Sequence, residues 1–183
     1  MDNNHDIRQI YNLTLIGFMG TGKTTVGRII ASRLRYGFID TDHLIELRAG
    51  KAIPKIFEED GELKFREYEK EVLKELANFR KMVIATGGGL GANQENIDSL
   101  KTHSLVVCLC ASVQTIYSRV KSQTYRPLLC TADPMAKIKE LLAIREPIYR
   151  QADVLISTDM RSVREVAQQV IFHFRLFRSK VKN

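Results

Sequence analysis

Several features that stabilise or anchor other proteins are missing from this sequence. Its three cysteines are an odd number without paired spacing, and no cluster of His and Cys has the spacing of a zinc site. The longest apolar run, residues 105–111, is too short to cross a bilayer. The first residues carry neither a basic flank nor an apolar stretch, so we expect no signal peptide. We therefore expect a protein of the reducing cytoplasm that has no membrane partner.

No repeat or low-complexity segment is visible, so we expect one domain over residues 1–183. With 44% hydrophobic and 27% charged side chains, the chain is able to bury a core without disulfides. The formal net charge is +7, and residues 173–183 contain four basic side chains and no acidic ones. We expect this basic tail to be a solvated end. The charge fits a nucleic-acid-binding protein or a protein that binds small polyanions.

Short β-rich segments alternate with longer amphipathic segments along the chain. Apolar runs predict strands at residues 13–16, 37–40, 82–85, 105–110 and 153–157. Helical spacing, with Ser112 and Pro134 as start signals, predicts helices at residues 24–34, 62–79, 113–121, 134–144 and 162–174. This alternation predicts an α/β fold with a five-stranded parallel sheet covered on both faces. Residues 121–133 follow neither period, which is typical of a surface loop or of a mobile lid.

The strongest motif is GFMGTGKT at residues 17–24, between the first predicted strand and the first predicted helix. It matches the G-x-x-x-x-G-K-[ST] phosphate-binding loop, or P-loop. The glycines let backbone N–H groups converge on phosphate oxygens, and the helix N-terminus adds a positive field. In such a loop Lys23 reaches the β- and γ-phosphates and Thr24 coordinates Mg²⁺. The motif therefore predicts binding of a nucleoside triphosphate.

Two common classes of P-loop protein do not fit. A GTPase carries an Asn-Lys-x-Asp motif that recognises the base, and this sequence has none. A motor or helicase ATPase usually carries an apolar strand that ends in an acidic residue, whereas the third predicted strand ends in ATGGG at residues 85–89. Glycines after a buried strand let the backbone approach a ligand closely, although the triplet alone is equally typical of a mobile turn.

Two carboxylates, Asp40 and Asp42, follow the second predicted strand. Ligands of open parallel sheets bind beyond the carboxyl ends of the strands, where both side chains are expected to face the P-loop. One carboxylate can hold a water on Mg²⁺, and the other can accept the proton of a hydroxyl that attacks a phosphoryl group. A structural alternative exists for Asp42, which could cap a helix that begins at His43.

Four arginines complete a basic site that is suited to anions. Arg66 lies at the edge of an apolar helix stripe, where pairing with Glu62 is an equally good interpretation. Arg145 lies near a predicted helix end, and Arg119 and Arg126 flank or occupy the predicted lid. Arginines on a lid can close over a triphosphate and neutralise the charge that develops during phosphoryl transfer.

Taken together, these residues resemble the shikimate kinase family. The resemblance covers about residues 12–172, in family order and spacing. It is carried by residues 17–25, DTD at 40–42, GELKFR at 61–66, ATGGG at 85–89, RPLL at 126–129, and Arg145 with Pro147 and Tyr149. It implies a single, monomeric domain with the three-layer fold of P-loop kinases that resemble nucleoside-monophosphate kinases, with a lid at about 121–133. The lid is less charged than is common in the family, and the tail runs past the usual end.

The resemblance also implies a reaction, which is ATP-dependent phosphorylation of the 3-hydroxyl of shikimate on the pathway to chorismate and aromatic amino acids. The implied catalytic residues are Lys23, Asp42 and Arg126, and Thr24 with Asp40 would hold one Mg²⁺ ion. The implied nucleotide-binding residues are Gly20, Thr21, Gly22, Lys23, Thr24, Thr25, Arg119, Arg126 and Arg161. The implied shikimate-binding residues are Asp42, Arg66, Gly88 and Arg145.

Independent chemistry agrees with this set, because a small anionic polyol needs cations for its carboxylate and an acceptor for its hydroxyls. Two alternatives remain open at this point. Another small-molecule P-loop kinase, such as a gluconate kinase, shares the phosphate-binding loop. A basic P-loop protein that binds RNA is supported by the basic tail, whereas the kinase hypothesis predicts no nucleic-acid partner.

Overall fold

One parallel sheet forms the centre of the computed structural model, which describes residues 8–121, 131 and 133–180. In this part of the chain the sheet has five strands in the order β2-β3-β1-β4-β5, and every neighbouring pair is parallel. Residues of β1 and nearly all residues of β4 are buried, as the continuous apolar runs predict. The strands are β1 (Asn12–Ile16), β2 (Gly37–Asp40), β3 (Met82–Ala85), β4 (Ser104–Cys110) and β5 (Val154–Ser157).

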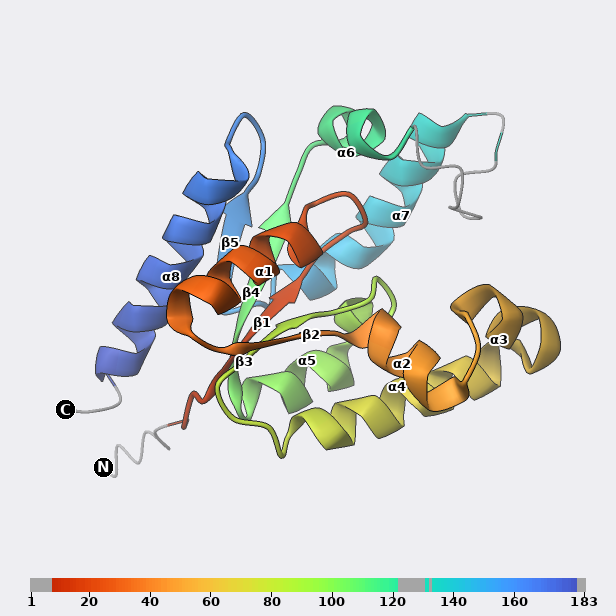
Figure 1. Ribbon diagram of the computed structural model, residues 1–183. Helices are drawn as coiled ribbons and strands as arrows, with labels where there is room; N and C mark the ends of the chain where they lie inside the picture. Colours follow the sequence, from red (N-terminus) through yellow and green to blue (C-terminus); the bar gives the residue numbers. More distant parts are fainter. Residues whose placement is uncertain (1–7, 122–130, 132, 181–183) are drawn as a thin grey trace, which may run out of the picture.

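Helices cover both faces of the sheet (Figure 1). Leu13, Leu15 and Val107 pack on one face against α1 and α8. Ile16 and Val106 point to the opposite face, where they meet a core that includes side chains of α4, α5 and α7. The helices are α1 (Lys23–Leu34), α2 (Thr41–Ala49), α3 (Ile53–Glu59), α4 (Gly61–Leu76), α5 (Gln94–Lys101), α6 (Val113–Val120), α7 (Pro134–Tyr149) and α8 (Val163–Lys180), with a short 3₁₀ turn η1 (Leu90–Ala92).

The predicted α/β fold with its five-stranded parallel sheet and two helix layers is confirmed. The start signal at Ser112 is also correct, since its side chain accepts a hydrogen bond from the backbone N–H of Thr115 at 3.2 Å. Three helices, α2, α3 and α5, were not delimited from the sequence. The helix α7 continues past the predicted end at residue 144, because Pro147 lies in its last turn and removes only one backbone donor.

The closing helix corrects a second expectation. The basic end was expected to be a solvated tail from residue 173, but α8 continues to Lys180. Buried Phe174 belongs to the core cluster that includes Ile30 of α1 and contacts the ring of Tyr36, and the guanidinium of Arg178 donates to the hydroxyl of Tyr36 at 2.7 Å. Most of the basic end is therefore part of a packed helix.

The capping interpretation of Asp42 is wrong. The helix α2 begins at Thr41, and its N-cap is Asp40, whose carboxylate accepts a hydrogen bond from the backbone N–H of Asp42 at 3.2 Å. Asp42 lies inside the first turn, so its side chain is not used as the cap.

Because all the strands run in the same direction, their carboxyl ends meet at one edge of the sheet. The P-loop follows β1, Asp40 ends β2, and glycines 87–89 follow β3. The predicted lid at 121–133 falls mostly outside the described residues, as does Arg126. None of the described helices has the length and apolar character that spanning a membrane requires.

Candidate active site

The P-loop is built around three glycines with positive φ angles. Gly17, Gly20 and Gly22 have φ values of 132°, 74° and 92°, a region that side chains other than glycine rarely adopt. The helix α1 begins directly after Gly22, and no side chain among the described residues caps its N-terminus. The Nζ atom of Lys23 donates to the backbone oxygens of Gly17 and Phe18, each at 2.9 Å. The loop therefore combines a helix N-terminus with an ammonium group, which suits a phosphate chain.

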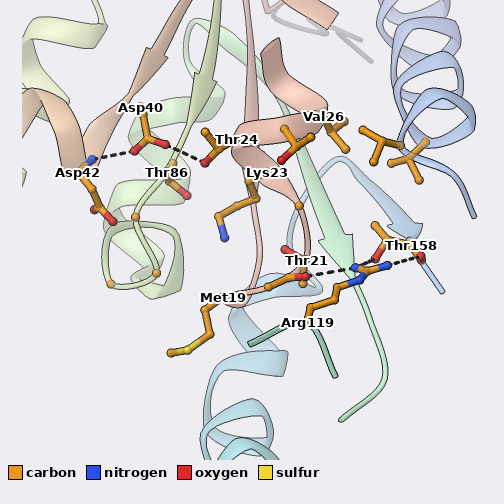
Figure 2. A pocket seen from close by; sticks show the side chains of 18 of the residues that line it. Met19, Thr21, Lys23, Thr24, Val26, Asp40, Asp42, Thr86, Arg119 and Thr158 are labelled. Carbon is orange, nitrogen blue, oxygen red and sulfur yellow. Dashed lines mark hydrogen bonds between the residues drawn. The ribbon is translucent and has the colours of Figure 1, made fainter. Parts of the chain in front are cut away.

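Asp40 connects this loop to the neighbouring strand end. The hydroxyl of Thr24 donates to Oδ2 of Asp40 at 2.8 Å, while Oδ1 of Asp40 caps α2 (Figure 2). Two hard oxygen atoms, one from the first turn of α1 and one from the end of β2, are thus placed side by side near Lys23. This arrangement fits the way proteins hold Mg²⁺, with one or two oxygen ligands from side chains and the rest from phosphates and water.

Asp42 faces the glycine loop after β3. The backbone N–H of Gly87 donates to the hydroxyl of Thr41 at 2.8 Å, which fixes the loop against the start of α2. A Cβ atom at Gly87 would overlap the carboxylate of Asp42, so the close approach of the two segments requires glycine here. The carboxylate of Asp42 is half-buried at the wall of the same cavity as Lys23.

Arg66 and Arg145 reach the same loop from α4 and α7. The guanidinium of Arg145 donates to the backbone oxygen of Gly88 at 3.4 Å, and a Cβ atom at Gly89 would overlap the guanidinium of Arg66. Arg66 also pairs with Glu62 at 2.8 Å, so the pairing along the helix that the sequence suggested is present too. Burial opposes the charge of Arg66, but its hydrogen bonds with acidic neighbours outweigh this and raise the pKa of Arg66. Arg66 is therefore held in its charged form at the glycine loop, which Arg145 also contacts.

Arg119 and Arg161 lie on the opposite side of the site. The guanidinium of Arg119 donates to the backbone oxygen of Gly20 at 3.2 Å, and to the hydroxyl and backbone oxygen of Thr158 at 2.9 and 3.0 Å. It therefore joins the P-loop to the segment after β5. Arg161, in that segment, donates to the side chain of Gln169 at 2.6 Å.

One cavity of about 560 Å³ joins these groups. Figure 2 shows Asp40, Asp42 and Thr86 on one side, Arg119 and Thr158 on the other, and Lys23 between them. Arg66 lies in an adjoining cavity of about 340 Å³ that shares Gly89 and Arg145 with the main one. The main cavity is lined by the predicted residues Gly20, Thr21, Gly22, Lys23, Thr24, Thr25, Asp40, Asp42, Gly88, Arg119, Arg145 and Arg161.

Comparisons with known proteins decide between the kinase classes. The family model described as shikimate kinase matches residues 19–174. The shikimate kinase of Thermodesulfovibrio yellowstonii is 44% identical over 160 residues, which cover 87% of this chain and 92% of the relative. The chain belongs to the shikimate kinase family. It is thus an ATP-dependent phosphotransferase.

Solved structures agree with this assignment. A shikimate kinase from Acinetobacter baumannii, in complex with shikimate, superposes with a TM-score of 0.83 at 41% identity and covers 91% of this chain and 93% of that one. A gluconokinase from Sinorhizobium meliloti reaches a TM-score of 0.62 at 18% identity, with coverage of 94% and 96%, and this likeness shows a shared fold alone. The gluconate kinase alternative is therefore not favoured.

Three residues of this shikimate kinase family site were missed at the sequence level. Thr41 and Thr158 fix the glycine loop and Arg119 through their hydroxyls, and Glu69 holds Arg66 at 2.6 Å. Burial raises the pKa of Glu69, and the hydrogen bond with Arg66 offsets this increase only in part. The position of Glu69, three residues after Arg66 on one helix, was a signal that could have found it. Thr158 offered no such signal, because its role depends on contacts between distant segments.

Proposed function

We propose that this chain transfers the terminal phosphoryl group of ATP to the 3-hydroxyl of shikimate, with roles divided between the two sides of the cavity. The observation that carries this proposal is the convergence of Lys23, Asp42 and Arg145 on one cavity between the P-loop and the glycine loop. The membership in the shikimate kinase family supports the choice of acceptor.

The P-loop side binds the nucleotide. The uncapped start of α1 and the ammonium of Lys23 hold the β- and γ-phosphates, and Lys23 neutralises the charge on the phosphoryl group in transit. Arg119 and Arg161 border the nucleotide from the segment after β5. Thr24 and Asp40, the latter through a water, would hold Mg²⁺, and the bound ion would supply charge neutralisation at the phosphates of ATP.

The glycine-loop side binds shikimate. The planar guanidinium groups of Arg66 and Arg145 bind its carboxylate, and the backbone N–H of Gly88 donates to the bound molecule. Asp42 accepts hydrogen bonds from the ring hydroxyls. It also takes the proton of the attacking hydroxyl, so that the new oxygen–phosphorus bond forms while ADP leaves.

Arg126 remains a prediction, because it lies outside the described residues. We propose that it adds charge neutralisation at the transferring phosphoryl group, so that Arg126→Ala would lower turnover strongly and acceptor affinity less. We also propose that the protein works as a cytoplasmic monomer without a nucleic-acid partner.

The experiment that tests the proposed function is a steady-state assay of ADP release from Mg²⁺ and ATP. Release should depend on shikimate and should not increase when gluconate replaces it. Release with gluconate alone would contradict the choice of acceptor. A salt-dependent gel shift with RNA, without shikimate-dependent release, would favour the RNA-binding alternative.

A further inference from the structure

A further cavity, of about 550 Å³, lies beside the P-loop between the end of β4 and α7. It is separate from the acceptor side of the active site, although Thr21 contributes to both cavities. Nothing in the proposed reaction uses it. Its walls are largely apolar and include Phe18, Val113, Leu142, Ala143 and Leu155.

Two thiols stand in the wall of this cavity. Cys108 and Cys110 are two residues apart on β4, so their side chains point to the same face of the sheet. Their sulfur atoms are 3.6 Å apart and form a hydrogen bond, and neither cysteine is in a disulfide. Cys108 is fully buried, whereas Cys110 is half-buried. The pair therefore has one sulfur that reagents can reach and one directly behind it.

The hydrogen bond makes the two sulfurs unequal. It lowers the pKa of Cys110, and together with burial it raises the pKa of Cys108. Because the thiolate is the reactive form, Cys110 is the first nucleophile of the pair, and Cys108 follows once a first bond holds the reagent in place.

The strand geometry opposes a direct disulfide between them. Cys108 pairs with Ile16 on one side and Leu155 on the other, and Cys110 pairs with Ser157, so β4 is held extended. Two residues of extended strand span about 6.6 Å, near the upper limit of about 6.8 Å between Cα atoms in disulfides. A single bridging atom asks for less movement, because two bonds of about 2.3 Å to sulfur, at angles between about 90° and the tetrahedral value, set two sulfurs about 3.3–3.8 Å apart, and the sulfurs of Cys108 and Cys110 are 3.6 Å apart.

We propose that Cys108 and Cys110 form a second ligand site, which binds thiophilic centres that bond to two sulfurs at once, such as trivalent organoarsenicals, and that its occupation inhibits the kinase. With phenylarsine oxide, two arsenic–sulfur bonds form, and the oxygen of the reagent leaves as water with the two thiol protons. No oxidant is needed, because arsenic stays trivalent. The apolar walls of the cavity receive the phenyl group.

The inhibition follows from contact between this part of β4 and the P-loop. Cys108 pairs with Ile16, the residue directly before Gly17. A Cβ atom at Gly17 would overlap the backbone oxygen of Leu109, which lies between the two thiols, so loop and strand are in direct contact. Phe18 also lines the cavity, so a bound aryl group meets the P-loop. A small shift of β4 on binding therefore moves the groups that hold the phosphates.

The test treats the purified protein with phenylarsine oxide and follows intact mass and shikimate-dependent ADP release. Cys130→Ser serves as the background, so that only the pair remains, and each protein is compared with its own untreated activity. We expect one adduct per chain and a loss of turnover of at least about tenfold, since misplacing catalytic groups by about 1 Å can have larger effects. A dithiol such as dithiothreitol should remove the adduct and restore turnover, whereas 2-mercaptoethanol at equal thiol concentration should do neither.

The decisive variants are Cys110→Ala and Cys108→Ala in the same background. Neither variant should form an adduct that survives 2-mercaptoethanol. Each should keep its turnover when it is treated with phenylarsine oxide. Cys110→Ala changes only a half-buried position, so it decides alone if Cys108→Ala does not fold. An unchanged adduct in Cys110→Ala, or no adduct in the background protein, would overturn the site.

The measurement of ADP release rests on the proposed function, whereas the measurement of the adduct by intact mass does not. A protein that forms the reversible adduct but shows no shikimate-dependent turnover contradicts the proposed function and keeps the site. A stable adduct without loss of turnover overturns the inhibitory part of the proposal.

Discussion

Polar side chains are arranged in opposite ways at the two edges of the central sheet, the amino edge where the strands begin and the carboxyl edge where they end. At the carboxyl edge, Lys23, Arg119 and Arg145 converge on one cavity. At the amino edge, polar side chains bond to one another or to the backbone inside the protein. The side chain of Asn12 is fully buried there, donates to the backbone oxygen of Phe79 at 2.8 Å and accepts from the N–H of Met82 at 3.0 Å.

Other groups at the amino edge follow the same pattern. The hydroxyls of Thr14 and Ser104 lie 2.8 Å apart, and Ser104 donates to the backbone oxygen of Leu100 at 2.7 Å. Arg8 pairs with Asp153 at 2.7 Å. Buried polar groups that satisfy one another specify a structure, whereas several cations directed at one cavity are arranged for an anion. Substitutions at the amino edge should therefore affect stability, and substitutions at the carboxyl edge should affect catalysis.

The largest expected effect is that of Lys23→Ala. Turnover should fall by about 10²–10³-fold or more, because the ammonium stabilises charge that develops in the transition state. The melting temperature should stay close to that of the unaltered protein. Steady-state kinetics and thermal unfolding check both statements. Lys74→Ala, on the exposed side of α4, is the matched control and should leave both values unchanged. Turnover within tenfold of the unaltered protein would refute the assignment of the P-loop.

At the opposite edge, Asn12→Ala should act on stability alone. It removes the hydrogen bond with the His103 ring and two hydrogen bonds with backbone groups, and it leaves these backbone groups without the side chain that satisfies them, which costs about 2–4 kcal/mol. For a chain of this size the melting temperature should fall by roughly 5–15 °C, with turnover at low temperature unchanged. Thermal unfolding and kinetics at low temperature measure the two effects. A loss of turnover in the folded protein would show that the two edges are not separable.

Arg66→Lys and Arg145→Lys sharpen the comparison within the carboxyl edge. Lysine keeps the charge but loses the planar fork that binds a carboxylate with two hydrogen bonds. The Michaelis constant for shikimate should rise by about tenfold in each variant, and that for ATP should change little. Arg150→Lys, on an exposed pair with Glu146, is the control. An increase for ATP alone would mean that these arginines belong to the nucleotide side.

Asp159→Ala should have a smaller effect, confined to the nucleotide. Its carboxylate accepts from the backbone N–H of Ser112 at 3.0 Å and holds the segment after β5 against the start of α6. Losing this contact loosens Thr158 and Arg119, so the Michaelis constant for ATP should rise by about threefold. The constant for shikimate should stay the same. Equal increases for both substrates would point to a general loss of structure instead.

The smallest effect concerns acidification at the amino edge. Burial lowers the pKa of His103, which is packed beside Asn12 and near Arg80. The unfolded chain therefore takes up a proton near the ordinary pKa of 6.5, before the folded protein does. Stability should be unaffected by this group above that pH and should fall as the pH decreases below it.

The measurement for His103 is urea unfolding at pH 8 and at pH 5.5. His103→Gln should lose less stability between these two conditions than the unaltered protein does. An equal loss in both proteins would assign the pH dependence to other groups.

Most residues of the carboxyl edge could be predicted from the sequence, because short local motifs supply its functional side chains. The P-loop requires glycines, Lys23 and Thr24 in a fixed register, and the buried strands read as continuous apolar runs. The positions of Asp40 and Asp42 follow from the end of a parallel strand. Predictions of this kind need no knowledge of distant contacts.

The amino edge and the helix ends could not be predicted, for reasons that are equally physical. Asn12 forms hydrogen bonds with residues some 70 positions away, and no local sequence pattern indicates such a partner. Whether Asp40 or Asp42 caps α2 is decided by where β2 ends against β3. The length of α8 depends on contacts of Phe174 and Arg178 with Tyr36, which favour a helix where charge alone predicts a solvated end.

The central claim is that the carboxyl edge joins ATP to shikimate, and its product can be observed directly by phosphorus NMR. With Mg²⁺, ATP and shikimate, the spectrum should show ADP and a new phosphate monoester in equal amounts, with little inorganic phosphate. Lys23→Ala should give neither ADP nor the monoester on the same time scale. ADP accompanied by inorganic phosphate alone, or a spectrum unchanged by shikimate, would contradict the account.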